Sequence, residues 1–444
     1  MPDPLRPNSP PARTQTQRTA GLPVHADSSH THTMTTPTLI PTDLVTPLGA
    51  YLRLRGPGRA SFLLESVDQG RLGRYSLIGS GTRVVDLAEA ERCNEPVVGH
   101  VGYDWIAQLE PTVPLPRPGR GLPESQFVVA DQLVRFDHVR GVAEVLRGDV
   151  AEIAALLDAP VAAPAGASGY PSGPIRRTPS QAEHEAGVLR CKEYIRDGDA
   201  FQIVLSQRAE RPTSATALAI YRALRRVNPS PYLFLLEFEG MALIGSSPET
   251  HVKLVGTRAS LNPIAGTTPV GDGDAERLLT SEKDRAEHVM LVDLGRNDLS
   301  RVCKPGTVHV ERFLQVERFS HVTHLVSEVA GEIRDGFTAW DLLRATFPAG
   351  TVSGAPKVRA MQIISELEGF RRGFYAGVVG YHIPGVGLDT CIALRTMLLH
   401  DGVAHLQAGG GLVADSDPTA EHLECLNKLA AIERAIDLAE TESR

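Results

Sequence analysis

Carboxylates spaced along a predicted C-terminal helix are the residues of this chain best placed for chemistry. Glu421, Glu424 and Lys428 follow one another at intervals of three and four residues, so they share one helix face. Asp417 as N-cap and Pro418 at the first helical position predict where that helix begins. The same spacing also fits an exposed charged stripe with one Glu to Lys pair, so this helix alone does not define a site.

A second carboxylate, Glu287, lies in a predicted helix beside Met290, Leu291 and Leu294. We expect it to point toward a partly apolar interior, where a carboxylate needs a partner. If Glu287 and Glu424 share a divalent ion, the few oxygen donors suit Mg²⁺ that keeps several waters and an anionic substrate. The sequence therefore predicts a magnesium site and disfavours zinc.

Three consecutive glycines, Gly409, Gly410 and Gly411, come just before the C-terminal helix. We expect them at the end of a strand, where bare backbone N–H groups could form a nest for a carboxylate. Three glycines in a row are not specific by themselves. Their position directly before Glu421 and Glu424 is what favours a site.

The spacing of apolar residues and the helix-capping residues predict the helices and strands that would position these residues. Expected helices span residues 181–197, 214–227, 275–298, 338–347, 355–369 and 419–440. Expected strands span residues 59–67, 126–138, 141–146, 230–238, 241–247, 251–256, 375–383, 390–400 and 403–409. Runs of adjacent strands with helices between them predict an α+β fold rather than a strict βαβ series.

Composition divides the chain into four parts. Residues 1–33 are rich in Pro, Ser, Thr, Arg and His, so we expect a disordered tail. Residues 34–157 read as a β-rich region that contributes to a regulatory site, and residues 158–174, made of small residues and proline, read as a linker or surface loop. Residues 175–444 would form the catalytic domain.

Charge and cysteine content exclude several classes. A net charge of -8 without a basic stripe argues against a nucleic-acid partner. The five cysteines are odd in number and far apart, which is typical of reduced thiols in a cytosolic protein. The chain shows no apolar run of membrane length and no signal peptide, so we expect a cytoplasmic protein without a membrane partner.

A series of ordered motifs points to a family. "LLES", "NPSPY", "GSSPE", "PIAGT", "AEHVMLVDLGRNDL", "VERFSHVTHLVS", "FPAGTVSGAPKVRAM", "LDTCIALRT" and "VADSDPTAEHLECLNK" occur in this order. From about residue 40 to the end, the sequence resembles the large subunits of anthranilate synthases, which are chorismate-utilising enzymes. The resemblance implies an α/β sandwich with large, mainly antiparallel sheets, a chorismate site and a Mg²⁺ cofactor.

The resemblance also implies roles for individual residues. Ammonia would attack ring carbon C2 of chorismate while the C4 hydroxyl leaves, and Glu249 matches the acid that protonates that hydroxyl. Glu287 and Glu424 match the metal ligands, with Glu421 as a close neighbour, and His324 matches the histidine that helps in losing pyruvate. The remaining matched positions would contact the substrate: Gly266, Thr267, Thr351, Tyr375, Arg395, Gly409, Gly410, Gly411 and Lys428.

Two positions distinguish members of the family. Relatives that add water carry a lysine where this chain has Gln202, and relatives that make the para isomer carry a lysine where it has Ala265. Neither residue can serve as a base or a nucleophile, so ammonia must come from outside. Since no "G-x-C-x-G" motif surrounds any cysteine, the chain itself has no glutaminase site. The resemblance implies a glutamine amidotransferase subunit in a two-plus-two heterotetramer.

The resemblance further implies feedback inhibition by tryptophan, at a site that would include Ser66, Pro231, Tyr232 and Leu233. The alternative is that these residues only belong to core strands. The chain departs from the family pattern at Asn262, where an arginine is usual, and at "TTPVG" over residues 267–271, and both changes remove positive charge near the ring-binding loop. Two other functions stay open: an aminodeoxyisochorismate synthase that does not eliminate pyruvate, and a non-catalytic paralogue that binds chorismate or tryptophan.

Overall fold

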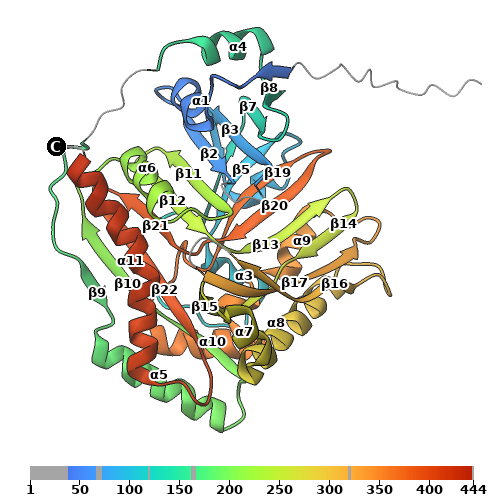
Figure 1. Cartoon of the computed structure of the whole chain (residues 1–444), viewed down its shortest axis with the longest axis vertical. Coiled ribbons are helices and arrows are strands. Elements are labelled where there is room, and N and C mark those ends of the chain that lie inside the picture. Colours follow the sequence, from blue (N-terminus) through green and yellow to red (C-terminus); the bar gives the residue numbers. More distant parts are fainter. Residues whose placement is uncertain (1–38, 67–72, 119–120, 162–166, 319–321, 443–444) are drawn as a thin grey trace, which may run out of the picture. The chain divides into compact units, whose positions relative to one another are not determined.

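The computed structural model describes residues 39–66, 73–118, 121–161, 167–318 and 322–442. The predicted tail over residues 1–33 lies outside these ranges, as does part of the predicted linker at residues 158–174. The described residues form one compact unit. Its described strands build two large antiparallel sheets with helices packed on them, which confirms the predicted α+β class (Figure 1).

Both sheets combine strands from distant parts of the sequence. The first sheet has the order β1 (Leu39–Pro41), β8 (Val142–Arg147), β7 (Gln132–Asp137), β3 (Tyr75–Gly81), β2 (Ala60–Glu65), β11 (Tyr232–Phe238), β12 (Met241–Ser247), β21 (Thr396–His400), β22 (Val403–Leu412), β10 (Gln202–Pro212) and β18 (Gly354–Ala355), and β9 (Arg176–Thr178) also pairs with β10. The second has the order β15 (Ile264–Pro269), β17 (Val322–Glu332), β14 (Arg258–Leu261), β13 (Thr250–Val255), β20 (Gly387–Ile392), β19 (Val378–Ile383), β5 (Val97–Val101), β6 (Ser125–Val129) and β4 (Arg83–Val85), and β16 (His309–Arg318) also pairs with β17. The predicted regions 34–157 and 175–444 therefore share both sheets, and their division stays a prediction about function.

Two hydrophobic cores follow from the alternation of side chains along the strands. In β11, Phe234 and Leu236 belong to the core formed jointly by the two sheets, whereas Leu233 and Leu235 belong to the core on the other face of the first sheet. Burying one such side chain contributes about 1.5–3 kcal/mol. The helices that cover this other face are α1 (Pro47–Leu54), α4 (Val150–Asp158), α6 (Ala217–Val227) and α11 (Pro418–Glu442).

The other described helices include the one that carries Glu287. They are α2 (Leu87–Ala90), η1 (Tyr103–Trp105), α3 (Ile106–Leu109), α5 (Gln181–Arg196), α7 (Asp274–Thr280), α8 (Glu282–Ser300), α9 (Ala339–Thr346), η2 (Gly350–Val352) and α10 (Lys357–Glu368). The single helix predicted over residues 275–298 is wrong, because Ser281 ends α7 and caps α8, its hydroxyl accepting the Asp284 N–H at 3.2 Å. No helix in the described ranges is long and apolar enough to cross a membrane.

The single strand predicted over residues 390–400 is also wrong. Arg395 has a φ of 47°, which breaks the strand into β20 and β21. Because β20 belongs to the second sheet and β21 to the first, the chain crosses between the sheets at this arginine. The break therefore places Arg395 where the two sheets meet.

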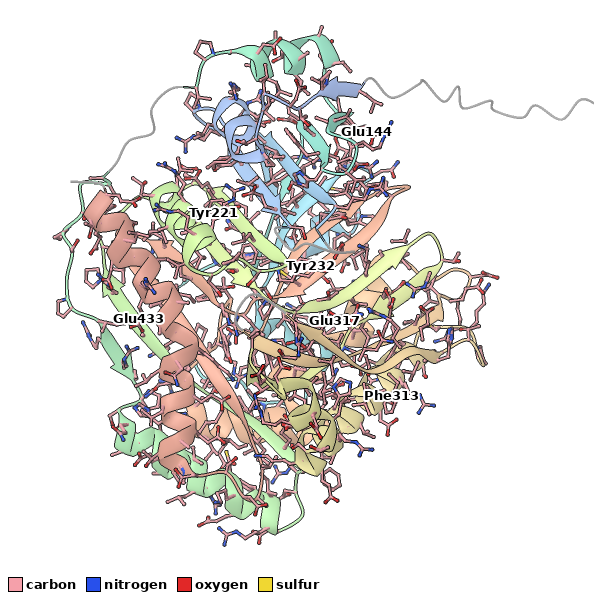
Figure 2. All side chains as sticks on the ribbon, viewed as in Figure 1. Glu144, Tyr221, Tyr232, Phe313, Glu317 and Glu433 are labelled. Carbon is pink, nitrogen blue, oxygen red and sulfur yellow. The ribbon has the colours of Figure 1, made fainter. Side chains whose placement is uncertain are left out.

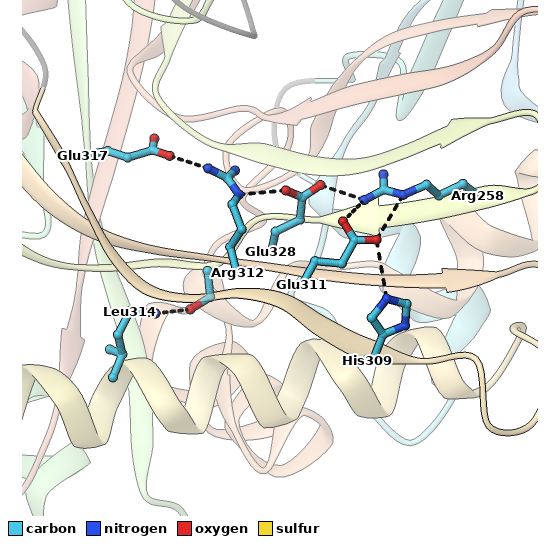
Figure 3. A network of polar contacts seen from close by, with 8 residues as sticks. Arg258, His309, Glu311, Arg312, Leu314, Glu317 and Glu328 are labelled. Atoms are coloured by element: carbon cyan, nitrogen blue, oxygen red, sulfur yellow. Dashed lines mark hydrogen bonds and ion pairs between the residues drawn. The ribbon is translucent and has the colours of Figure 1, made fainter. Parts of the chain in front are cut away.

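A network of charged side chains fastens β16 to β17 and β14 (Figure 3). Glu328 of β17 is buried and accepts hydrogen bonds from Arg258 at 2.8 Å and from Arg312 at 2.9 Å. Burial opposes ionisation of Glu328, but the two arginines outweigh it and lower the pKa of the carboxyl. The network thus stabilises the strand that carries His324.

Candidate active site

Glu249 lies between β12 and β13 and has the properties of a general acid. Its backbone is fixed by hydrogen bonds, since its N–H donates to Ser247 Oγ at 3.3 Å and its carbonyl accepts the Ile392 N–H at 3.0 Å. The residue is only 8% exposed, and burial raises the pKa of the carboxyl to about 7. The nearby Thr351 hydroxyl and the Lys428 ammonium favour the ionised form, but burial outweighs them. Near neutral pH this carboxyl can therefore donate a proton.

The loop motif that contains Ala265 forms a bulged strand next to His324. Gly266 has a φ of 67° and lies at the register shift between β15 and β17. His324 Nδ1 is 3.2 Å from the Gly266 carbonyl oxygen, and His324 is the register partner of Thr267. Burial lowers the pKa of His324, which favours the neutral imidazole. The backbone of Thr267 pairs with His324 of β17, whereas its side chain is outside the described part of the structure, so its contact with the substrate stays a prediction.

Arg395 brings a largely buried positive charge to the same place. Burial lowers the pKa of its guanidinium, and its charge in turn helps to lower the pKa of His324, so the two side chains are neighbours. No ion pair in the described ranges includes Arg395. A buried guanidinium of this kind suits a ligand carboxylate, which it can bind with two parallel hydrogen bonds.

The three glycines lie at the end of a strand, as expected, because they belong to the last four residues of β22, where they pair with β10. Val204 and Ser206 of β10, the register partners of Gly411 and Gly409, direct their N–H groups away from β22, to Ser353 and Glu368. In an antiparallel pair, Gly409 and Gly411 must then direct their own backbone groups away from β10. These N–H groups face the β21 side of β22, beyond Leu406, the last β22 residue that pairs with β21, so neither neighbouring strand uses them.

Each of these glycines lies so close to another predicted site residue that a side chain would collide with it. A Cβ atom would stand within 3 Å of a polar atom in all three cases: Gly409 against Tyr375 Oη at 2.8 Å, Gly410 against Glu421 Oε2 at 2.8 Å, and Gly411 against Gln202 Nε2 at 2.6 Å. At Gly409 the Leu205 carbonyl oxygen, 2.6 Å from such a Cβ, also excludes a side chain, whereas at Gly410 and Gly411 the ends of the Glu421 and Gln202 side chains would have to move. The sequence predicted that these glycines lie at the end of a strand but could not show this close approach.

The predicted metal ligands come from α8 and α11. Gln202 Nε2 donates to Glu287 Oε1 at 2.7 Å, and burial raises the pKa of Glu287, with a further increase from the charge of Glu424. Lys428 Nζ lies 2.7 Å from Glu424 Oε1 and donates to the Gly409 carbonyl at 2.8 Å. The charge of Glu424 therefore acts on Glu287 across the site. Lys428 connects Glu424 to β22, because it contacts both the Glu424 carboxylate and the Gly409 carbonyl.

Glu421 lies close to this pair without completing a three-carboxylate site. Burial raises its pKa, and the charge of Glu424 raises it further. Within the ranges that the structure describes, no three His, Cys, Asp or Glu side chains converge as a ready-made metal centre. The space beside Gly410 that a Cβ would fill is bordered by Glu421 and Glu424. Two carboxylates with room for water and substrate oxygens fit a magnesium ion.

The four residues predicted for inhibitor binding line one cavity of about 790 Å³, among them Tyr232, labelled in Figure 2. Ser66 Oγ is buried and has no hydrogen-bond partner in the described structure. Tyr232 Oη bonds to Thr250 Oγ1 at 2.8 Å, one residue from Glu249. Lys253 also lines the cavity, and its Nζ lies 2.8 Å from Asp389 Oδ2 on the neighbouring strand. Sequence reasoning missed this ion pair, because the two residues are far apart in the sequence and become neighbours only where β13 pairs with β20.

Comparison with known proteins agrees with this site. A family model described as chorismate binding enzyme matches residues 64–434, and the chain belongs to this family. It is 45% identical to anthranilate synthase component 1 of Streptomyces coelicolor, covering 90% of this chain and 88% of the relative, and 42% identical to the probable anthranilate synthase component 1 of Schizosaccharomyces pombe, covering 91% and 92%. The crystal structure of anthranilate synthase component I from Streptococcus pneumoniae superposes with a TM-score of 0.72 at 33% identity, over 88% of this chain and 98% of that one.

Proposed function

We propose that this chain is the chorismate-converting subunit of an anthranilate synthase, which makes anthranilate and pyruvate from chorismate and ammonia. The observation that carries the proposal is the buried carboxyl of Glu249, whose pKa is raised to about 7. An acid that stays protonated near neutrality is what a hydroxide leaving group needs. Ala265 and Gln202 supply neither an amine nor a base for water, so the nucleophile is external ammonia.

The site residues divide the reaction between binding and proton transfer. Arg395 binds the enolpyruvyl carboxylate, and Gly409 and Gly411 present backbone N–H groups to the substrate. Glu249 gives its proton to the C4 hydroxyl, which leaves as water while ammonia bonds to C2. His324, neutral because burial lowers its pKa, then accepts the ring proton. The ring C–O bond breaks, the enolpyruvyl group takes up a proton to become pyruvate, and the ring becomes aromatic.

Magnesium is part of the proposal. Glu287 and Glu424 are the side chains that would hold Mg²⁺, and Lys428 keeps Glu424 in place through its 2.7 Å contact. When bound, the ion supplies Lewis acidity and orientation at the ring carboxylate. The close approach of Gly410 to Glu421 and Glu424 supports this assignment, because a Cβ at this position would displace the end of the Glu421 side chain beside Glu424.

A separate glutamine amidotransferase subunit supplies the ammonia, because the cysteines of this chain are not suited to release it from glutamine. All five cysteines are free, and burial raises the pKa of the Cys191 and Cys425 thiols to about 12, which suppresses the nucleophilic thiolate. The partner would assemble with this chain as a heterotetramer in the cytoplasm. Mass measurement of the mixed subunits would test that stoichiometry.

Tryptophan acts as feedback inhibitor in the proposed function, bound in the cavity that contains Ser66 and Tyr232. The unpaired Ser66 hydroxyl offers a hydrogen bond to a polar ligand, and apolar walls from Leu64 and Leu77 suit an indole ring. The bond from Tyr232 to Thr250 leads from this cavity to the backbone beside Glu249. Binding of tryptophan can therefore displace the acid from its working position.

The direct test uses the purified chain with chorismate, Mg²⁺ and an ammonium salt at high pH, where free ammonia replaces the partner. Anthranilate fluorescence and pyruvate should appear together. Accumulation of aminodeoxyisochorismate without pyruvate would favour the runner-up enzyme. Binding of chorismate without any product would favour a non-catalytic paralogue.

A further inference from the structure

A cavity of about 40 Å³ lies beside Glu249, and we call it the inner cavity. Its apolar wall includes Leu261, Leu291 and Leu294, and the other lining residues come mainly from α8 and from the segment around η2. Arg395 and the glycines of β22 do not line it. Glu249 and Asp298 therefore line the same cavity.

Two buried oxygens on the wall of the inner cavity lack hydrogen-bond partners in the described structure. They are Thr351 Oγ1, which lies near the Glu249 carboxyl, and Asp298 Oδ1 on α8. Buried polar atoms in native proteins are almost always satisfied, by ordered water where protein groups do not reach them. The cavity is polar at these points and large enough for water.

The other oxygen of Asp298 belongs to a buried ion pair. Lys357 Nζ lies 2.7 Å from Asp298 Oδ2 and also donates to the Thr346 carbonyl at 3.3 Å. Burial raises the pKa of Asp298 and lowers the pKa of Lys357, while each partner's charge acts in the opposite direction. Burial thus brings the proton affinities of the two groups closer together, which suits a pair that passes a proton on.

The proposed reaction makes a further demand on Glu249. Glu249 gives up one proton in each turnover and must regain one before the next. Only 8% of the residue is exposed, so its carboxyl has little direct contact with bulk solvent. The inner cavity, which Glu249 and Asp298 both line, offers a route for that proton.

We infer that water in the inner cavity connects Glu249 with Asp298, and that this path returns a proton to Glu249 after each turnover. The inference rests on the acid role of Glu249 in the proposed function. A cavity water transfers a proton to the Glu249 carboxylate and takes one from the Asp298 and Lys357 pair, which regains it from solvent. The proton lost when the ammonia nitrogen becomes an amine balances this uptake.

The inner cavity is a poor route for ammonia itself. Ammonia is a base, and on its way past Glu249 it would take the proton that the leaving hydroxyl needs. The resulting ammonium ion is no nucleophile. Water carries protons along the same path without consuming the acid, so the chemistry favours a proton path.

The test replaces Asp298 by Asn, alone and together with Lys357→Met. The single change removes the proton carrier but leaves the Lys357 charge buried and unpaired, whereas the double change removes both charges and protects the fold. Asp293→Asn, on the same helix with its side chain 63% exposed, is the matched control. Ammonia-dependent anthranilate formation is measured with Mg²⁺ in H₂O and in D₂O.

Both Asp298 variants should lower kcat by about tenfold or more while the KM for chorismate stays unchanged, because the path affects proton return and not binding. The ratio of kcat in H₂O to that in D₂O should rise, and the Asp293 control should behave like the unaltered chain. A folded double variant with unaltered kcat and isotope ratio would overturn the inference. If the unaltered chain makes no anthranilate, the proposed function fails instead.

Discussion

Replacing Glu249 by Gln tests the electrostatics of the site in a way that does not depend on turnover. The pKa of this carboxyl rises from the ordinary glutamate value of 4.5 to about 7 on folding, mainly through burial. Between these two pH values the folded chain keeps a proton that the unfolded chain loses. The unaltered protein therefore loses stability as the pH rises through this window, by about 3 kcal/mol in total. At pH values above this window, the loss of stability is complete and no longer changes with pH.

Glutamine has nearly the same shape but no titratable proton. The difference in unfolding free energy between the unaltered chain and Glu249→Gln should therefore decrease by about 3 kcal/mol between pH 4.5 and pH 7. The contributions of the other titrating groups to the pH dependence largely cancel in this difference, because both proteins contain these groups. Denaturant unfolding of the two proteins at a series of pH values measures this difference. A difference that stays constant across the window would refute the raised pKa.

The same variant tests the acid role. Without a proton to donate, turnover should fall by about 100- to 10,000-fold, whereas chorismate should still bind because Arg395 and the β22 glycines are untouched. Calorimetric titration with chorismate and anthranilate fluorescence separate the two effects. Undiminished turnover would remove Glu249 from the mechanism.

Three further substitutions follow from the geometry. Gly410→Ala would place a Cβ 2.8 Å from Glu421 Oε2, so the Mg²⁺ concentration for half-maximal activity should rise by about tenfold. An unchanged Mg²⁺ concentration for half-maximal activity would contradict the metal assignment. Ala265→Lys would put an amine at a buried position of the bulged strand and should block or divert ammonia addition; unchanged anthranilate formation would show that this strand does not approach the ring. Ser66→Leu would fill part of the inhibitor cavity and should weaken tryptophan binding by about tenfold with uninhibited activity preserved, which calorimetry and inhibition curves can check.

Local signals in the sequence predicted the elements that depend on local physics. The capping box of Ser180 and Glu183 begins α5 as the predicted helix required, and Asp417 Oδ1 accepts the Ala420 N–H at the start of α11. The strand at Tyr232–Phe238 was predicted from its apolar run. In each case the residues that decide the structure lie within a few positions of one another.

Features that depend on distant contacts could not be predicted in this way. Arg395 interrupts an otherwise continuous β pattern because the chain changes sheets there, and nothing in the neighbouring residues marks the crossing. Gly409 and Gly411 were expected at the end of a strand, but nothing in the neighbouring residues shows that they pack against Tyr375 and Gln202. Asp298 was overlooked, since its importance arises only where α8 and α10 bring it to Lys357.

The central claim is that this chain converts chorismate with ammonia at Glu249, and one measurement tests it most directly. The purified chain is mixed with chorismate, Mg²⁺ and ammonium at high pH, and anthranilate and pyruvate are quantified together. The two products should form in equal amounts and both should disappear in Glu249→Gln. A folded chain that binds chorismate but forms no anthranilate under these conditions would contradict the account.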